Sequence, residues 1–223
     1  MPLTVLIGGF GRFPGAPFNP TTPLVERLAK RSRPALADVH RVSHVFRTSY
    51  AAVDRDLSAL IARHQPDIVL LFGLATRTIA LRIEARAANR RATQCPDVDG
   101  YAPADPAIDV QGPEFLSSRA PHRRLVRAAR SAGMATRLSH DAGNYLCNYC
   151  YWRALETVER GGNAPIVQFV HVPNLRTGTR RARVRDAGSP CRAATLADLV
   201  RAAEAILVTL VATARADRSR RRR

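Results

Sequence analysis

The chain has 223 residues, of which 46% are hydrophobic, and its formal net charge is +17. This length and composition can bury one sizeable core, and no long polar linker divides the chain, so we expect a single domain. The start, Met1 to Ile7, is a short apolar run without a basic leader or a cleavage site, which argues against a secretion signal. Every apolar stretch is far shorter than the roughly 20 residues of a membrane helix. We therefore expect a soluble, cytoplasmic protein without a membrane partner.

The positive charge alone would suggest binding to nucleic acid or to an anionic surface. Nearly all of it comes from arginines scattered along the chain, and Lys30 is the only lysine. The exception is the run from Arg218 to Arg223. Because like charges repel one another, we expect residues 217–223 to form a disordered basic tail behind a domain of residues 1–216. A basic binding module stays open as a minor alternative.

The predicted elements begin with a strand over Leu3 to Gly8, a helix over Thr22 to Arg31, a strand over Val39 to Phe46 and a helix over Ala51 to Arg63. Pro66 stops that helix. Ile68 to Phe72 is a continuous aliphatic run, which predicts a central strand buried on both faces. Thr78 to Ala88 alternates apolar and polar residues, which predicts a strand whose polar face carries Glu84.

The segment from Thr93 to Pro121 is rich in Pro, Gly and Asp and lacks periodicity, so we expect a long functional or mobile loop with room for a small hairpin. The remaining elements are a helix over His122 to Gly133, a strand over Ala135 to Ser139, a helix over Tyr145 to Arg160, a strand over Ile166 to Val170 and a helix over Ala193 to Ala214. The alternation of strands and helices predicts an α/β fold with a mostly parallel sheet.

The glycine-rich segment Gly8 to Gly15 follows a strand and precedes a helix, as a dinucleotide-binding turn does. The match fails, because the third glycine of G-x-G-x-x-G would have to be Pro14 and the helix begins only near Thr21. The segment is then either a plain strand-to-helix loop or one wall of a pocket. Phe10 and Phe13 favour the pocket, since exposed aromatics at the end of a strand are typical of binding sites.

Four cysteines, namely Cys95, Cys147, Cys150 and Cys191, are expected to be free thiols in a reducing compartment. Cys147 lies in the first turn of its predicted helix, where unpaired backbone N–H groups and the helix dipole stabilise a thiolate. The alternatives are a buried packing cysteine, or redox chemistry with Cys150 at thioredoxin-like spacing. Metal binding is disfavoured because no second pair of Cys or His ligands completes a zinc site.

A nucleophilic cysteine needs a base, and His171 follows directly after the predicted strand ending at Val170. Because parallel strands end at the edge of a sheet where helices begin, we expect His171 to meet Cys147. Glu84 would orient and charge-stabilise the imidazole as a third member. The alternatives are a structural histidine and an ordinary surface carboxylate.

Together these segments resemble the pyroglutamyl-peptidase (pyrrolidone-carboxylate peptidase) family of cysteine peptidases over nearly the whole chain. Four motifs carry the resemblance, in this order: Gly9-Phe10-x-x-Phe13-x-Gly15 with Asn19-Pro20, Glu84-x-Arg86-Ala87-x-Asn89, Ser139-x-Asp141-Ala142-Gly143-x-Tyr145-x-Cys147-Asn148, and Phe169-Val170-His171-Val172-Pro173. The resemblance implies an open α/β/α sandwich. It also implies that Cys147, His171 and Glu84 form a catalytic triad.

The implied substrate is a peptide with an N-terminal pyroglutamyl (5-oxoproline) residue, cleaved by acyl transfer through a thioester without a metal or cofactor. By the same resemblance, the residues around the lactam ring are Phe10 and Phe13 against its faces, Asn19 as a brace of the loop, and Tyr145 and Leu146 on the other side. Family members often assemble as dimers or tetramers, which implies a homo-oligomer.

One departure concerns the tenth position after Glu84, where the family usually has an arginine and this chain has Gln94. Gly8 and Thr76 also replace a common threonine and a common glycine. The triad is intact, so removal of an N-terminal pyroglutamyl residue remains the expected function. The alternative is a divergent relative with weak activity or specificity for another N-terminal amide, with Arg90 or Arg91 as candidates to supply the missing charge.

Overall fold

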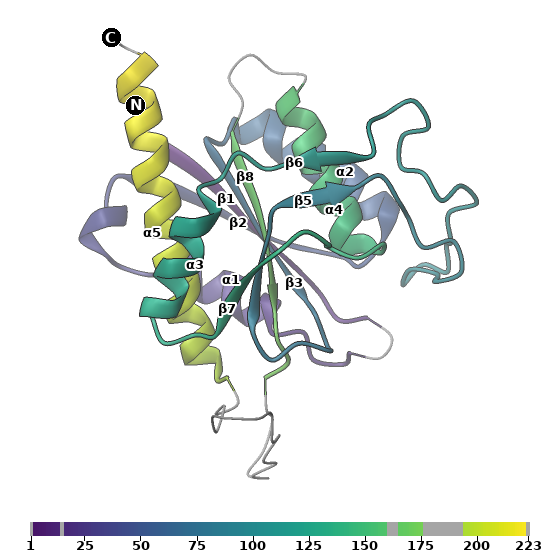
Figure 1. Ribbon diagram of the computed structural model, residues 1–223, viewed down its shortest axis with the longest axis horizontal. Coiled ribbons are helices and arrows are strands. Elements are labelled where there is room, and N and C mark those ends of the chain that lie inside the picture. The colour runs from purple at the N-terminus through teal and green to yellow at the C-terminus, as the bar shows by residue number, and fades with distance from the viewer. Residues whose placement is uncertain (1, 14–15, 160–164, 176–193, 222–223) are drawn as a thin grey trace.

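A computed structural model describes residues 2–13, 16–159, 165–175 and 194–221. Figure 1 shows the arrangement of its elements, which in chain order are β1 (Leu3–Phe10), α1 (Thr21–Ala29), a short 3-10 helix (Pro34–Leu36), β2 (Val39–Phe46), α2 (Tyr50–His64), β3 (Ile68–Leu74), β4 (Leu81–Glu84), β5 (Arg86–Ala88), β6 (Phe115–Ser117), α3 (His122–Ser131), β7 (Thr136–Ser139), α4 (Leu146–Glu159), β8 (Ile166–Val172) and α5 (Leu196–Arg221). Most bounds lie within two or three residues of the predicted ones.

Six strands form one sheet in the order β2-β1-β3-β8-β4-β7. The first four of these strands run parallel to one another, whereas β4 pairs antiparallel with β8 and parallel with β7. The expected single α/β domain with a mostly parallel sheet is therefore confirmed. The reversed direction of β4 and β7 was not anticipated, and it matters for the site because Glu84 ends β4.

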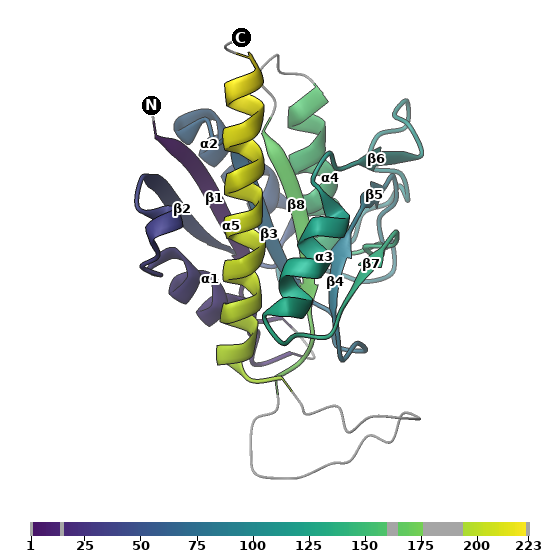
Figure 2. The ribbon, with the colours of Figure 1, turned by 60° about the vertical axis from the view of Figure 1, so that its left-hand side comes forward.

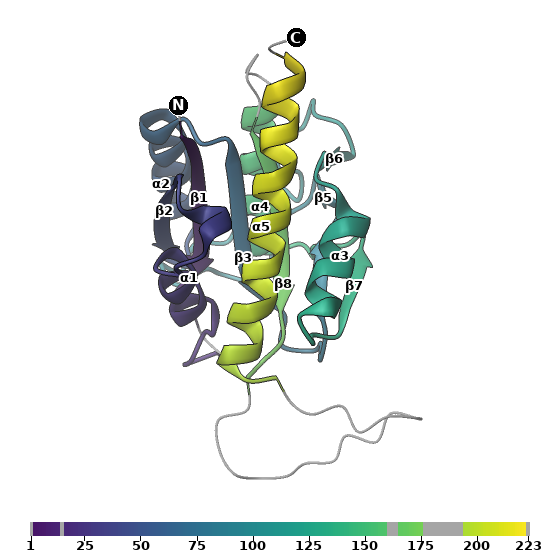
Figure 3. The ribbon, with the colours of Figure 1, turned by 90° about the vertical axis from the view of Figure 1, so that its left-hand side faces the viewer.

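Helices cover both faces of the sheet. Figures 2 and 3 show α5 lying along one face between α1 and α3, while α2 and α4 pack on the opposite face. The central strand β3 is buried at every position, as its aliphatic run predicted. Because side chains alternate along a strand, Leu70 and Phe72 pack under α5 and Val69 and Leu71 pack under α4.

The strand predicted over Thr78 to Ala88 is in fact two strands in different sheets. The chain leaves the large sheet at Ala85, whose N–H donates to the Ser139 carbonyl at 2.7 Å, and β5 then pairs with β6. Ile79, expected to be buried, lies before β4 and is 53% exposed. Glu84, expected on a polar face, is completely buried beside His171 of β8 and Tyr151 of α4. Local alternation therefore identified the strand and the buried side that carries Leu81 and Ile83, but not that Glu84 on the other side is buried as well.

The long segment from Thr93 to Pro121 runs outside the sheet beside α4 (Figure 1) and contains β6, which pairs antiparallel with β5. Asn89 anchors it, since its side-chain oxygen accepts from the backbone N–H groups of Ile108 and Asp109 at 2.8 and 2.9 Å. Hydrogen bonds to its backbone groups thus order the segment, which has no hydrophobic pattern of its own.

The expectation of a disordered tail is wrong for residues 217–221, the part of it that the structure describes. Helix α5 continues to Arg221, and Arg218 forms an ion pair with Asp67 at 2.6 Å, while Arg215 pairs with Asp38. These two aspartates lie just before β2 and β3. Their negative charges offset part of the repulsion between arginines that was expected to keep this segment disordered. Within the described ranges, no helix combines the length and apolar character needed to cross a membrane.

Candidate active site

Cys147 is the second residue of helix α4 and is partly exposed. Its position agrees with the predicted first helical turn, where backbone N–H groups have no partner within the helix. The Sγ atom lies against the end of β3: a Cβ atom added to Gly73 would be 2.6 Å from it. The thiol therefore occupies space that exists only because residue 73 has no side chain.

His171 lies in β8 directly beside Gly73, its Cα partner in β3. Its Nδ1 atom is 2.8 Å from Oε1 of Glu84, which comes from the neighbouring strand β4. Both side chains are buried, with 5% and 0% exposed. Tyr151 and Gln168 hold the backbone of Glu84, because the Tyr151 hydroxyl and the Gln168 amide each donate to its carbonyl oxygen at 2.9 Å.

The electrostatic environment favours a charged imidazole. Burial opposes the imidazolium and lowers the pKa of His171, but hydrogen bonds to Cys147 and Glu84, together with their charges, outweigh burial and raise this pKa to about 9. At neutral pH the ring is therefore protonated between a thiol on one side and a carboxylate on the other. Such an arrangement supports a thiolate–imidazolium pair.

The structure thus brings Cys147, His171 and Glu84 together, but not for the expected topological reason. The strand before α4 is β7, which runs antiparallel to β8, so the two ends do not share an edge by parallel pairing. The segment of residues 140–145 instead carries the chain from β7 to the start of α4. Glu84 is paired in register with Phe169 rather than with His171, and its side chain reaches the imidazole diagonally.

A cavity of about 840 Å³ opens beside the thiol. Glu84 lies behind His171 and does not line this cavity. The other eight residues that we expected in or beside the site do line it, namely Phe10, Phe13, Asn19, Gln94, Tyr145, Leu146, Cys147 and His171. The cavity joins the loop after β1, the long segment after β5 and the start of α4. These elements are far apart in the chain.

The two phenylalanines differ in their surroundings. Phe10 was expected to be exposed, but it is only 2% exposed and its ring packs against Phe46 with centroids 5.8 Å apart. It forms part of the cavity wall from within the core. Phe13 is half-buried, and its carbonyl accepts from the N–H of Ala16 at 2.9 Å.

Asn19 joins this loop to the start of α1. Its side-chain amide donates to the Gly11 carbonyl at 2.9 Å, and its side-chain oxygen accepts from the N–H and hydroxyl of Thr21 at 3.1 and 2.9 Å. It is only 3% exposed. This network has the geometry expected of a brace for the loop that carries Phe13.

Tyr145 and Leu146 form the side of the cavity next to the thiol. Leu146 is buried, and the Tyr145 hydroxyl donates to the Pro96 carbonyl at 2.9 Å, which ties the long segment to the start of α4. Burial and nearby negative groups raise the pKa of Tyr145 to about 12, so its hydroxyl stays protonated. Exposed Gln94 lies two residues before this attachment point.

The candidates for a compensating charge lie elsewhere. Arg90 forms an ion pair with Asp141 at 2.6 Å and does not line the cavity, and Arg91 lines a different, smaller one. Two arginines, Arg77 and Arg82, line the cavity, and Arg82 Nε lies 3.1 Å from Oε1 of Glu84. Sequence reasoning missed it, although residues 82 and 84 share one side of a strand by alternation.

The other cysteines argue against redox chemistry. Cys150 is completely buried, and burial together with the nearby charges raises the pKa of its thiol, so it is a packing residue in the core under α4. Cys95, Cys147 and Cys150 are free thiols, and Cys191 lies outside the described residues. Within the described ranges, no three His, Cys, Asp or Glu side chains gather as ligands for a metal ion.

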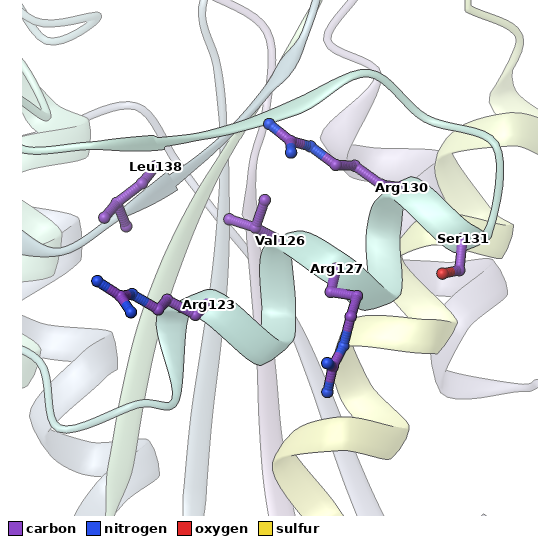
Figure 4. A pocket seen from close by; sticks show the side chains of 6 residues that line it. All are labelled: Arg123, Val126, Arg127, Arg130, Ser131 and Leu138. Carbon is purple, nitrogen blue, oxygen red and sulfur yellow. The ribbon is translucent and has the colours of Figure 1, made fainter.

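A second cavity of about 660 Å³ lies between α3 and β7. It is shown in Figure 4, and its lining consists of Arg123, Val126, Arg127, Arg130, Ser131 and Leu138. Arg130 donates a hydrogen bond from Nε to the Thr136 carbonyl at 2.9 Å. The lining offers no thiol, imidazole or carboxylate, so this basic hollow lacks the groups for nucleophilic or acid–base chemistry.

Comparisons with known proteins agree with the family resemblance found in the sequence. A model of the pyroglutamyl peptidase family matches residues 3–211. The pyrrolidone-carboxylate peptidases of Vibrio vulnificus and Bacillus subtilis are 32% and 30% identical to this chain over 171 and 174 residues, which cover 77% of the chain and 78% of each relative.

Solved structures extend the comparison to the fold. Pyrrolidone carboxyl peptidase from Thermococcus litoralis superposes with a TM-score of 0.85 at 25% identity and covers 97% of this chain and 96% of its own. For pyroglutamyl peptidase I from Bacillus amyloliquefaciens, the TM-score is 0.80 at 25% identity, with 95% and 96% covered.

Proposed function

The chain belongs to the pyroglutamyl peptidase family, and from this premise we propose that it removes an N-terminal pyroglutamyl residue from peptides with Cys147 as its nucleophile. The observation that carries the proposal is the pairing of one buried imidazole, His171, with Glu84 at the wall of a cavity that Cys147 also lines. A nucleophile, a base and a group that orients the base are the three parts that acyl transfer requires.

The first half of the proposed reaction is acylation. The Cys147 thiolate attacks the pyroglutamyl carbonyl carbon, a C–S bond forms, and the carbonyl oxygen takes up negative charge. Unpaired backbone N–H groups in the first turn of α4 can stabilise that oxyanion. When the C–N bond breaks, His171 gives its proton to the leaving amine, and the shortened peptide departs.

The second half is deacylation. Neutral His171 takes a proton from water, whose oxygen attacks the thioester carbonyl. The C–S bond then breaks, pyroglutamate leaves, and the thiolate–imidazolium pair is restored. Glu84 Oε1 faces Nδ1 of the ring throughout, so the other ring nitrogen is free to serve the thiol, the leaving amine and the water.

The cavity supports this substrate class. A pyroglutamyl ring is an uncharged lactam with apolar faces, one N–H and one C=O, and it needs apolar walls with a few fixed polar groups. Phe10, Phe13 and Leu146 supply apolar surface, while Asn19 braces the loop. We propose that Tyr145 lines the side nearest Cys147 and that Gln94 offers a neutral amide there.

Gln94 is the observation that favours a second candidate, a divergent peptidase with weak activity or with specificity for another N-terminal amide. Assembly as a homo-dimer or homo-tetramer and a cytoplasmic location also remain predictions. Free thiols at Cys95, Cys147 and Cys150 are consistent with a reducing compartment.

The proposal is tested with purified protein and a fluorogenic pyroglutamyl amide under reducing conditions, beside the matching prolyl and glutaminyl amides. We expect release of the fluorophore from the pyroglutamyl amide and none above background from Cys147→Ala. Preference for another amide would support the divergent alternative. Equal rates for wild type and Cys147→Ala would overturn both.

A further inference from the structure

Arg82 touches the carboxylate that orients the proposed catalytic histidine. It lies two residues before Glu84 in β4, and its Nε is 3.1 Å from Oε1 of Glu84, the same oxygen that lies 2.8 Å from His171 Nδ1. Its side chain is 21% exposed and lines the catalytic cavity. One carboxylate oxygen thus faces both His171 Nδ1 and the Arg82 guanidinium, the latter as an ion pair.

The guanidinium is itself held in place. Arg82 donates from Nη2 to the Ser139 hydroxyl at 2.8 Å and from Nε to the same hydroxyl at 3.2 Å, and it also donates to the Asp141 carbonyl. Ser139 is the register partner of Glu84 in β7, and Asp141 begins the segment that leads to Cys147. A planar guanidinium with several fixed partners loses little further freedom when it binds a carboxylate.

Glu84 requires such a partner because it is completely buried and its second oxygen, Oε2, has no hydrogen-bond partner among the described residues. A buried carboxylate is costly unless it is paired and hydrogen-bonded. His171 pairs with it as a cation only while the ring is protonated, and the proposed reaction removes that proton once in each turnover. The guanidinium of Arg82 is a positive charge that the proposed reaction does not remove.

From this geometry we propose that Arg82 is a positioning residue, which stays paired with Glu84 and keeps it correctly oriented during the part of the cycle in which His171 is neutral. The inference rests on the proposed function. It assigns Arg82 no contact with the reacting atoms: the arginine acts through Glu84. A purely structural clamp between β4 and β7 is the competing explanation, and it predicts lower stability without a change in chemistry.

The groups that face Glu84 are Arg82 from its own strand, His171 from β8, with Cys147 beyond it, and Tyr151 from α4, whose hydroxyl donates to the Glu84 carbonyl. Among them, the Arg82 guanidinium is the cation that takes no part in the proposed proton transfers.

The test compares Arg82→Met with Arg86→Met, which removes the same charge two residues beyond Glu84. Arg86 donates to the His140 carbonyl and stacks on Phe115, so it is a matched control away from the triad. For Arg82→Met we expect kcat to fall by about 10- to 100-fold, the loss typical of a buried charged group that is left without one of its partners, with KM changed less than about 2-fold. Arg82→Lys should recover part of kcat, and Arg86→Met should match wild type.

A second readout does not depend on the substrate. In the wild type, iodoacetamide should label Cys147, as followed by peptide mass spectrometry, and Arg82→Met should slow that labelling while Arg86→Met does not. Should Arg82→Met fail to fold, Arg82→Gln provides the same comparison. Unchanged labelling and unchanged kcat in a folded Arg82 variant would overturn the inference. Arg82-dependent labelling without hydrolysis of the pyroglutamyl amide would instead uphold it and refute the proposed substrate.

Discussion

Gly73 and His171 are register partners in β3 and β8, and the space above Gly73 holds the Sγ atom of Cys147. A Cβ atom at residue 73 would lie 2.6 Å from that sulfur and 2.7 Å from the ring of Phe169. The missing side chain therefore sets the position of the thiol relative to the imidazole. This relationship links the sheet register directly to the chemistry.

The first prediction concerns Gly73→Ala. The added methyl must displace the thiol or the Phe169 ring, so we expect kcat to fall by more than about 10-fold and the free energy of unfolding by about 1–3 kcal/mol, the usual cost of overpacking. Gly8→Ala is the matched control, since its Cβ would lie 2.6 Å from Leu71 in the same sheet but touch no site residue. Gly8→Ala should lower the free energy of unfolding while the kcat of the folded protein stays unchanged. Equal losses of kcat in both variants would refute the special role of Gly73.

The second prediction concerns pH. Burial lowers the pKa of His171, whereas hydrogen bonds to Cys147 and Glu84 raise it, to about 9 in total. Since this folded-state pKa lies above the ordinary 6.5, the stability gained from the imidazolium is complete below pH 6.5 and is lost as the pH rises through about 9. Activity that needs the imidazolium should decline over the same upper range.

Glu84→Gln removes a contribution that raises this pKa, so the alkaline limb of kcat/KM should move to lower pH by about one unit. The measurement is a pH–rate profile beside Glu26→Gln, a control on the exposed side of α1. An alkaline limb that stays in place in Glu84→Gln would show that this carboxylate does not support the imidazolium.

The third prediction concerns the aromatic loop. Phe13 is half-buried and lines the catalytic cavity, whereas Phe18 in the same loop is 45% exposed and does not line it. We expect Phe13→Ala to raise KM for a pyroglutamyl amide about 10-fold, as loss of roughly 1.4 kcal/mol of apolar contact would do. Phe18→Ala should leave KM unchanged, and similar KM values for both variants would remove Phe13 from the binding site.

The fourth prediction concerns Gln94, which lines the cavity with a neutral amide. A cation at this position would stabilise charge that develops on the substrate, so we expect Gln94→Arg to raise kcat/KM about 10-fold. Thr93→Arg, which places the same charge one residue away from the cavity lining, should have no such effect. A Gln94→Arg rate equal to wild type would favour altered specificity over a drifted active site.

Local pattern was sufficient for much of the fold. The strand over Val39–Phe46 was predicted at both ends, and the continuous aliphatic run at Ile68 predicted a buried central strand. These features depend on neighbouring residues in the chain. The start of α4 was predicted at Tyr145, one residue before its actual start at Leu146.

The environment of Glu84 was not predictable in this way. Its burial depends on α4, and its carbonyl is held by Tyr151, 67 residues later in the chain. Its direction toward His171 depends on the antiparallel pairing of β4 with β8, which no single segment encodes. Alternation indicated that residues 82 and 84 share a side of the strand, but not that Arg82 would contact the Glu84 carboxylate.

The most direct measurement is to find the acyl group on the enzyme. Wild-type protein turning over a pyroglutamyl amide is quenched in acid, digested and analysed by mass spectrometry, with Cys147→Ala as the control. We predict one pyroglutamyl group in thioester linkage on the peptide that contains Cys147, and none in the variant. An acyl group on Cys95, or hydrolysis that persists in Cys147→Ala, would contradict the account.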